Sequence, residues 1–353
     1  GIAQGYPELG FDTKAIPMYI IYVNGGHRNI RIKDCSFDSA TGGFFTDPLV
    51  NDIVIDGCEF RNMKYIPNKV NEPSAGGAGG YGVVFNQQGN PNNYGVTNGL
   101  IQNCTFENTV YRHAFYVQSS DKIRFLNNVI YGNPHNDVTG FEASINDRGS
   151  TNMLIEGNTQ YGGTIFYNGT YNFKGEIGHD ITIKNNIIVD VTSHRDAIGV
   201  INVRSNNTMI IDNEIKGVAD MNALNMASSC RNVIISGNYI QMVQGRKGTT
   251  SRNKAVIGSF ASNEVELSSV FITGNTIDVD GSTQFLMYFR FAKKLSNVQV
   301  FRNTFRCAKQ IVFEDIQLID GVSVSDNYFE GQQIYLERNI GSVTKKVIRD
   351  NGK

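Results

Sequence analysis

The sequence contains no tryptophan, and only 18% of its 353 residues are charged. Amphipathic helices need many charged residues on their solvent-exposed faces, so this low content disfavours a helical bundle. Lys and Arg number 32 against 33 Asp and Glu, so there is no overall positive field to hold nucleic acid or an anionic membrane. No segment approaches the roughly 20 apolar residues of a membrane span, and we therefore expect no membrane insertion.

Motifs that define many enzyme classes are missing as well. The 5 cysteines form no CxxC pair, and their odd number argues against a complete disulfide framework. There is no P-loop, Rossmann, zinc-finger or GxSxG pattern, which excludes nucleotide and serine-hydrolase chemistry of those kinds. Tight acidic clusters for Ca²⁺ are absent too, so we expect no metal and no cofactor.

One short segment recurs along the chain, as in NIRIKDCSF, NVIISGNYI and NVQVFRNTF. In each copy, apolar and polar residues alternate up to a turn residue. Aligned on that residue, the copies repeat about every 24 residues with loop-sized excesses, which is the signature of a solenoid. The aligned column consists of Cys35, Cys58, Cys104, Asn128, Asn158, Asn186, Asn213, Asn238, Asn275, Asn303, Asn327 and Asn351.

The residues around this column predict strands. Apolar residues commonly lie five and three positions before the column residue and two positions after it, for example Val233, Ile235 and Ile240 around Asn238. This alternation has a period of two, and a further strand precedes each segment. We therefore predict an all-β fold, a parallel β-helix of about twelve coils with three short strands per coil. It would span residues 20–353, after a lead-in segment at residues 1–19.

An inward asparagine at the bend can bond to the backbone of the neighbouring coils and to the next asparagine. Cys35, Cys58 and Cys104 occupy the same column, so we interpret them as small buried packing residues.

The NxxIxxNxI coils resemble the pectate-lyase-like right-handed parallel β-helix superfamily, from about Ile20 to Asn351. Within it, the chain is most similar to a bacteriophage tailspike polysaccharide depolymerase. The resemblance implies a right-handed helix, a polysaccharide substrate, a homotrimer, and a location outside the cell or on the virion surface. Since the chain starts without methionine and shows no capping helix, we also expect a removed upstream segment and flanking domains or partner chains. The outward apolar residues Leu126, Leu154, Ile211 and Ile234 point to oligomerisation as well.

The largest insertions border the first strand of each coil, so we expect the outer face of that strand to form the floor of a groove. Aligning first strands on their inward residues pairs Phe115 with Phe141. The outward row then reads Val84, Tyr116, Glu142 and Phe166, with Glu142 as its only acid. Tyr116 and Phe166 could stack on sugar rings, and Gln118 falls in a neighbouring row suited to hydroxyl groups.

We interpret Glu142 as a general acid and Asp196 as a general base. They lie two coils apart, about 2 × 4.8 Å, which approaches the roughly 6.5 to 9.5 Å of inverting glycosidases. His113 would orient substrate or stabilise charge, and Asp137 and Asp147 are substitutes for either acid. The alternatives are that His113 is a structural histidine and that Asp196 only pairs with Arg195 or caps a bend.

Several cations are candidate substrate-binding residues. Arg112 and Arg195, with His194 beside the latter, could hold the carboxylate of an acidic sugar. Arg246 and Lys247 belong to a loop with four positive charges in nine residues, which is either a solvated loop or a site for an anionic polysaccharide.

Two other functions stay open. A polysaccharide lyase would use a base next to a uronate carboxylate. Asn133, Pro134 and His135 faintly resemble the Asp-Pro-His motif of alginate epimerases, but asparagine replaces the acid, which makes an epimerase unfavoured. The non-enzymatic alternative is a β-helix that binds glycan or serves a structural role without cutting.

Overall fold

The computed structural model describes residues 19–63, 65–67, 77–86, 94–107, 113–132, 143–163, 165–169, 176–191, 199–219, 221–243, 255–279, 285–306, 310–330 and 334–349. They fall into two units, Gly1–Gly178 and His179–Lys353. All regular structure in the described ranges is β-strand. Accordingly, no helix there could cross a membrane. The predicted lead-in lies outside the described residues apart from Tyr19.

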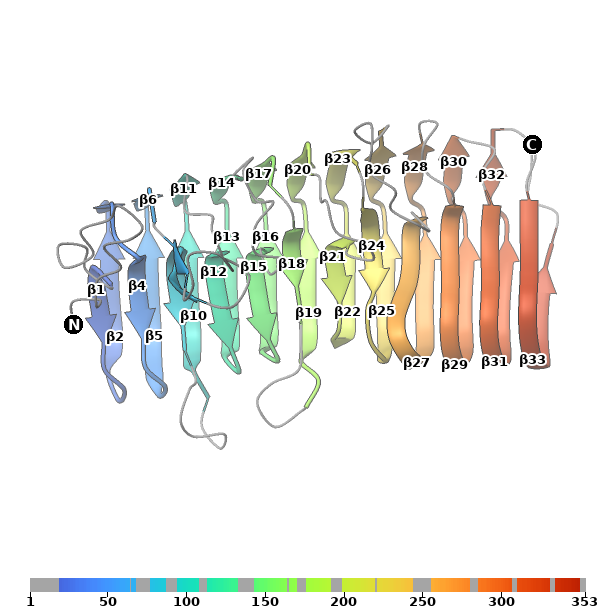
Figure 1. Cartoon of the computed structure of the whole chain (residues 1–353), viewed down its shortest axis with the longest axis horizontal. Coiled ribbons are helices and arrows are strands. Elements are labelled where there is room, and N and C mark those ends of the chain that lie inside the picture. Colours follow the sequence, from blue (N-terminus) through green and yellow to red (C-terminus); the bar gives the residue numbers. More distant parts are fainter. Residues whose placement is uncertain are drawn as a thin grey trace. The chain divides into compact units, whose positions relative to one another are not determined.

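The first unit contains three rows of parallel strands, shown side by side in Figure 1. Row one lies upstream in each coil, row two ends two residues before the column residue, and row three begins directly after it. Row one comprises β1 (Ile21–Val23), β4 (Gly42–Thr46), β9 (Tyr81–Phe85), β12 (His113–Gln118), β15 (Ala143–Arg148) and β18 (Ile165–Asn168). Row two comprises β2 (Arg28–Lys33), β5 (Val50–Asp56), β10 (Val96–Gln102), β13 (Asp121–Leu126) and β16 (Thr151–Glu156). Row three comprises β3 (Ser36–Asp38), β6 (Glu59–Arg61), β11 (Thr105–Glu107), β14 (Val129–Tyr131) and β17 (Thr159–Tyr161).

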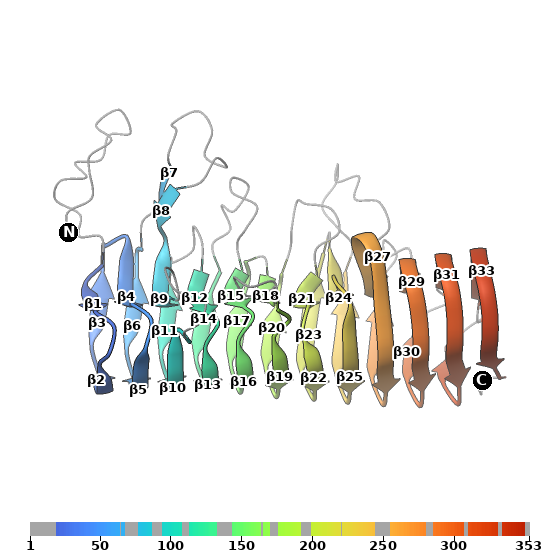
Figure 2. The same ribbon diagram turned by 90° about the horizontal axis from the view of Figure 1, so that it is seen from below.

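An antiparallel pair, β7 (Tyr65–Pro67) with β8 (Gly77–Gly79), precedes β9 and rises above it in Figure 2.

The second unit repeats the three-strand coil. Its early coils have row-one strands β21 (Gly199–Val203) and β24 (Asn222–Met226), and row-two strands β19 (His179–Lys184), β22 (Asn206–Ile211) and β25 (Cys230–Ser236). In the later coils rows one and two merge into β27 (Ala255–Thr273), β29 (Phe285–Phe301), β31 (Gln310–Ser325) and β33 (Ile334–Ile348). Row three comprises β20 (Ile187–Val189), β23 (Glu214–Val218), β26 (Tyr239–Met242), β28 (Thr276–Val279), β30 (Thr304–Arg306) and β32 (Tyr328–Phe329).

The predicted all-β parallel β-solenoid with three strands per coil is therefore confirmed. The described residues hold five row-three strands in the first unit and six in the second, slightly fewer than the twelve coils expected. The last column position, Asn351, lies outside the described residues.

Each coil turns at a residue in the left-handed backbone region, directly before the column. The φ angles are 54° at Asn103, 52° at Asn127, 55° at Asn185 and 53° at Asp212. Glycine occupies the same place in other coils. Asn, Asp and Gly tolerate this conformation better than other residues, which explains their recurrence there.

The asparagine column forms the predicted buried ladder. In the second unit, the side-chain amide nitrogen of each column asparagine donates to Oδ1 of the next, at 2.9 Å from Asn186 through Asn213, Asn238, Asn275 and Asn303 to Asn327. The same Oδ1 atoms also accept the backbone N–H of the preceding column residue, at 3.0 Å between Asn213 and Asn238. The column therefore satisfies its own polar atoms inside the core.

The core itself consists of stacked apolar side chains. In row three the rings of Phe37, Phe60 and Phe106 stack with centroids 4.7 and 5.0 Å apart. Cys58 and Cys104 are buried as predicted, and burial raises the pKa of the Cys104 thiol to about 12. The prediction was wrong for Cys35, which is exposed, because β3 is the first described strand of its row and nothing described stacks over it.

The ladder predicts a large difference between two Asn→Asp changes. Asn238 Nδ2 donates to Asn275 Oδ1, Ile210 O and Ser236 O. Asn238→Asp removes the amide NH2 group, whose two hydrogens serve these three contacts, and places a carboxylate against the three oxygens, so it should lower the free energy of unfolding by roughly 3 kcal/mol or more.

Asn232→Asp is the matched control, because Asn232 is exposed and makes one similar amide contact, to Asn207. It should change stability by only about 0.5 kcal/mol. Thermal unfolding followed by circular dichroism measures both, and equal losses would contradict a stabilising ladder.

Candidate functional site

A group of polar and aromatic side chains gathers on neighbouring row-one strands of the first unit. We call it the β12 cluster, and it consists of Tyr81, His113, Tyr116, Gln118, Asn146 and Arg148, from β9, β12 and β15. The parallel register places Tyr81 beside His113 and Tyr116 beside Asn146. Residues that are 30 to 33 positions apart in sequence therefore contribute to one cluster.

The aromatic rings of the cluster lie against one another. The His113 ring stacks on Tyr116 with centroids 5.3 Å apart and an interplanar angle of 21°. Tyr81 lies 5.7 Å from each of these two rings. The guanidinium carbon of Arg148 is 5.6 Å from the Tyr116 ring centroid, a cation–π contact. Gln118 Nε2 donates to Tyr116 Oη at 2.6 Å, which holds the ring in place.

Asn146 is the buried polar centre of the cluster. Its side-chain amide nitrogen lies 3.1 Å from Nε2 of His113, and the residue is 7% exposed. Because an amide nitrogen donates, Nε2 of His113 accepts, and the neutral ring then carries its proton on Nδ1. Oδ1 of Asn146 has no hydrogen-bond partner among the described residues. A buried unpaired acceptor is costly, so this oxygen is a natural place for a ligand hydroxyl or N–H.

The register of this face differs from the one predicted. Phe115 pairs with Ile145, four residues later than the expected Phe141. Asn146 therefore occupies the place beside Tyr116 that the sequence alignment assigned to Glu142. The error arose because the insertion before β15 has no periodicity, and because Asp147 made the end of the strand look like a polar loop.

Two expected site residues turn out to be buried. Phe166 has no exposed surface, so it does not present a ring for stacking. Asp147 is likewise 0% exposed and pairs with Val117 of the core. The backbone N–H of Ser150 donates to its Oδ1 at 3.1 Å, and Tyr167 Oη donates to its Oδ2 at 3.2 Å. Burial raises the pKa of Asp147 to about 6, although these hydrogen bonds oppose the shift.

Of the other predicted site residues, His113, Tyr116 and Gln118 come together in the β12 cluster. The rest lie outside the described residues: Glu142, Asp137, Asp196, Arg112, His194, Arg195, Arg246 and Lys247. Sequence reasoning missed Asn146 and Arg148. The available signal was the alternation of residues along β15. If Ile145 and Asp147 both point inward, Asn146 and Arg148 must point outward.

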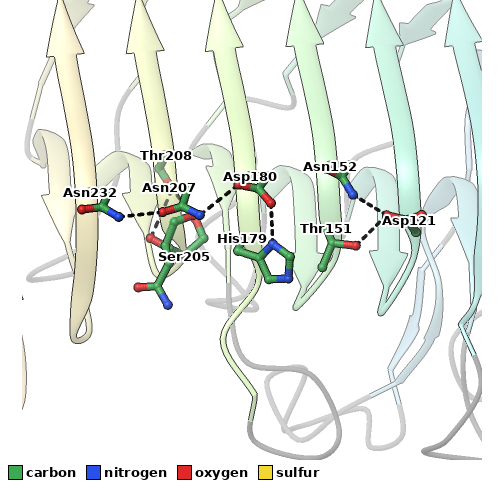
Figure 3. Close-up of polar contacts among 10 residues, drawn as sticks. Asp121, Thr151, Asn152, His179, Asp180, Ser205, Asn207, Thr208 and Asn232 are labelled. Atoms are coloured by element: carbon green, nitrogen blue, oxygen red, sulfur yellow. Dashed lines mark hydrogen bonds and ion pairs between the residues drawn. The ribbon is translucent and has the colours of Figure 1, made fainter.

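A second polar ladder, also missed, lies on the surface at the start of row two (Figure 3). In the second unit, Asn232 donates to Asn207 and Asn207 to Asp180, both at 2.9 Å, and Asp180 Oδ2 lies 2.7 Å from His179 Nδ1. In the first unit, Asn152 and Thr151 both donate to Asp121 at 2.7 Å. The signal was a polar residue six or seven positions before most column residues. Asp180, Asn207 and Asn232 have left-handed φ angles, so we assign this ladder to turn stability.

The described residues contain no group of three or more His, Cys, Asp or Glu side chains that could hold a metal ion.

Comparison with known proteins supports the fold. No protein-family model matches the chain, and no curated protein matches its sequence. Among solved structures, a mutant tailspike protein of E. coli bacteriophage HK620 in complex with a hexasaccharide is 10% identical, with a TM-score of 0.51 over 94% of this chain and 67% of that one. A family 28 exopolygalacturonase from Yersinia enterocolitica is 11% identical, with a TM-score of 0.48 over 94% and 72%. The Streptococcus pneumoniae surface protein and adhesin PfbA is 11% identical, with a TM-score of 0.45 over 93% and 91%.

These likenesses concern architecture. The chain has the parallel β-helix fold found in tailspike and pectate-lyase-like proteins, as its coils predicted.

The buried Asp147 predicts an unusual pH dependence of stability. In the folded protein the pKa of Asp147 is about 6, above the ordinary 3.8, so folding favours the protonated side chain. This contribution to the stability of the folded state is fully present below about pH 4 and is lost as the pH rises through 6. Asp147→Asn removes this titration. At pH 8 the variant should be more stable than the wild type, by roughly 3 kcal/mol.

Thermal unfolding at pH 4, 6 and 8 measures the effect. At pH 4 the advantage should vanish, and Glu107→Gln, the same change from carboxyl to amide at an exposed position, is the control. If Asp147→Asn were no more stable than the wild type at pH 8, the carboxyl would have to be ionised without cost inside the core.

Proposed function

We propose that this protein binds and hydrolyses an extracellular polysaccharide on the outer face of β9, β12 and β15. The observation that carries the proposal is the unpaired, nine-tenths buried Oδ1 of Asn146 amid the rings of the β12 cluster. A suitable ligand would donate a hydrogen bond to Oδ1 of Asn146 and place a flat apolar face against the aromatic rings. Sugars have this combination, because pyranose rings carry hydroxyl groups at their edges and C–H groups on their faces.

Arg148 adds a preference for acidic sugars. It is exposed and lies at the end of β15, next to Gln118 in the register. A guanidinium can pair with a carboxylate through two parallel hydrogen bonds. The one carboxylate on β9, β12 or β15 is that of Asp147, and it is buried in the core. A uronate or similar sugar is therefore the favoured substrate.

Hydrolysis requires acids that the cluster itself lacks. Glu142, the residue directly before β15 in the sequence, remains our general acid, and Asp196 remains the base predicted from the sequence. Asn146, and not Glu142, occupies the position beside Tyr116. In this scheme Glu142 protonates the leaving oxygen while the base activates water.

Two alternatives use the same face. A lyase would remove a proton next to a uronate carboxylate held by Arg148, and a non-catalytic protein would bind the glycan without cutting it. A solved structure of similar fold is a tailspike in complex with a hexasaccharide. That fact concerns the tailspike, and it makes a bacterial surface polysaccharide a reasonable first substrate to test.

The experiment is incubation with a panel of bacterial capsular polysaccharides. We expect new reducing ends from hydrolysis, whereas unsaturated uronate absorbance would indicate a lyase. Glu142→Gln should lower turnover by on the order of 10² or more and leave binding intact, since it removes the proton and keeps the shape. Tyr116→Ala should weaken binding about tenfold, or 1.4 kcal/mol, because it removes the stacking surface.

Tyr131→Ala is the control, since Tyr131 is an exposed tyrosine on row three. Loss of binding in this variant but not in Tyr116→Ala would move the site to row three. Binding without any product would leave the non-catalytic function, and normal cleavage by Glu142→Gln would turn attention to Asp137.

We further propose that the protein is a homotrimer. An apolar line crosses the outer face of row two in the second unit, where Met209 pairs with Ile234 and Ile234 with Phe271. Met209 and Ile234 are 37% and 36% exposed. Adjacent exposed apolar side chains of this kind mark interaction surfaces.

Ile234→Lys tests the trimer, because a charge in this line should oppose its burial. Light scattering should give a mass near three chains for the wild type and a lower mass for the variant. A monomeric wild type at micromolar concentration would contradict the proposal.

A further inference from the structure

The merged strands β29, β31 and β33 each contain, in the first half of the strand, a residue with a left-handed backbone. These residues are Phe291, Asp315 and Asn339, with φ angles of 58°, 53° and 51°. Each directly follows a residue that pairs in the parallel register, so the three occupy equivalent places in neighbouring coils. Aspartate and asparagine tolerate this conformation, whereas a bulky phenylalanine is strained by it.

The structure of the coil does not explain why phenylalanine occupies this place. In the two neighbouring coils the equivalent side chains bond to each other, with Asn339 Nδ2 donating to Asp315 Oδ1 at 3.0 Å. Phe291 cannot extend this ladder, and its side chain is 42% exposed, so it does not fill the core either. A strained backbone that gains neither contact points to a function for the ring.

Arg290 lies against this exposed ring. Its guanidinium carbon is 4.1 Å from the centroid of Phe291, within the distance of a cation–π contact. Its Nε lies 3.4 Å from Asp315 Oδ2 and 3.7 Å from Glu314 Oε2. The two terminal nitrogens of the guanidinium form no hydrogen bond within the described residues, and the side chain is 27% exposed. Nε therefore holds the group in place, while the terminal N–H groups remain for a ligand.

Tyr288 holds the other side of this group. It is 2% exposed, and its hydroxyl donates to Glu314 Oε2. The ring of Tyr288 also lies 5.9 Å from the guanidinium carbon of Arg290. The carboxylate and the guanidinium are thus positioned before any ligand arrives, which lowers the entropy lost on binding.

The arrangement defines the chemistry of a ligand. An exposed aromatic ring offers a surface for an apolar face, and the adjacent guanidinium and carboxylates offer donors and acceptors. A sugar ring has C–H groups on its face and neighbouring hydroxyl groups that both donate and accept. Because Glu314 and Asp315 offset the charge of Arg290, the cluster has no excess positive charge to attract an anionic sugar.

We propose that Arg290 and Phe291 form a second carbohydrate-binding site, which takes a neutral sugar residue. The site lies on β29 and β31, which are adjacent in the second unit. It shares no residue with the β12 cluster of the first unit, whose Arg148 favours an acidic sugar. The protein would thus hold a glycan at two places with different preferences.

The test is affinity electrophoresis of the 353-residue protein in gels that contain dextran, galactan or mannan, which are neutral polymers. We expect at least one of them to retard the protein. Phe291→Asn should weaken this binding about tenfold, because it removes the ring. Arg290→Lys should also weaken it, since lysine lacks the flat fork of donors, whereas Phe291→Tyr should keep it.

Thermal unfolding separates a binding role of Phe291 from a structural one. Asparagine suits a left-handed backbone, so Phe291→Asn should unfold at a temperature no lower than the wild type. Tyr328→Ala is the matched control, because Tyr328 is an exposed aromatic residue on row three of the same unit. This variant should bind the neutral polymer as the wild type does.

Three results would overturn the proposal. They are no retardation by any of the three polymers, undiminished binding by folded Phe291→Asn, and an equal loss of binding in Tyr328→Ala. A lower unfolding temperature of Phe291→Asn with unchanged binding would make the ring structural. The three polymers carry no uronate, so this site can fail or hold whether or not the protein hydrolyses an acidic polysaccharide.

Discussion

A buried amide must find partners for its donors and its acceptor, and the asparagine column meets this need by repetition. Each column asparagine accepts bonds from one neighbour and donates to the next, as Asn238 does between Asn213 and Asn275. The bonds form only if consecutive coils place this residue at the same height and angle. The ladder therefore aligns the bends, and aligned bends bring like side chains together, as with Phe305 and Phe329, which follow Asn303 and Asn327 and whose ring centroids lie 4.7 Å apart.

Polar groups that do not repeat behave differently inside the same core. Asp147 has no equivalent carboxylate in the next coil and relies on Ser150 and Tyr167 for hydrogen bonds. Its raised pKa shows that these bonds do not fully replace water. Glu337 and Lys346, where the stack of described coils ends, solve the same problem as a pair of opposite charges that retains contact with solvent. Repetition, neutralisation and partial exposure are thus three ways in which the cores of the two units accommodate polar atoms.

The outer face is free of the constraint that governs the core. Each coil can change its outward residues and its insertions without disturbing the ladder, so a site can be assembled from adjacent coils. The β12 cluster arises in this way, with His113 on one strand and Asn146 on the next in contact at 3.1 Å. Because the strands beneath are held by parallel pairing, this geometry does not depend on loops.

Periodic features could be predicted from the sequence alone. The column residues, the apolar positions around them and the left-handed turns recur in nearly every coil, since stacking requires the same chemistry each time. The sequence therefore determined the solenoid, the inward apolar positions around the column, and the place of His113 and Tyr116 on a row-one strand. It also pointed to Cys58 and Cys104 as buried, although it could not tell that Cys35 lies where no described coil covers it.

The tertiary structure decided what has no period. After a long insertion, alternation only restricts a strand to every second position, so Phe115 could pair with Phe141 or with Ile145 on pattern alone. Only the complete pairing of β12 with β15 selects Ile145, and that choice buries Asp147 and sets Asn146 against His113. The ion pair of Glu337 and Lys346 was equally hidden, because a contact between residues nine positions apart on one strand depends on how the two halves of that strand face each other in space.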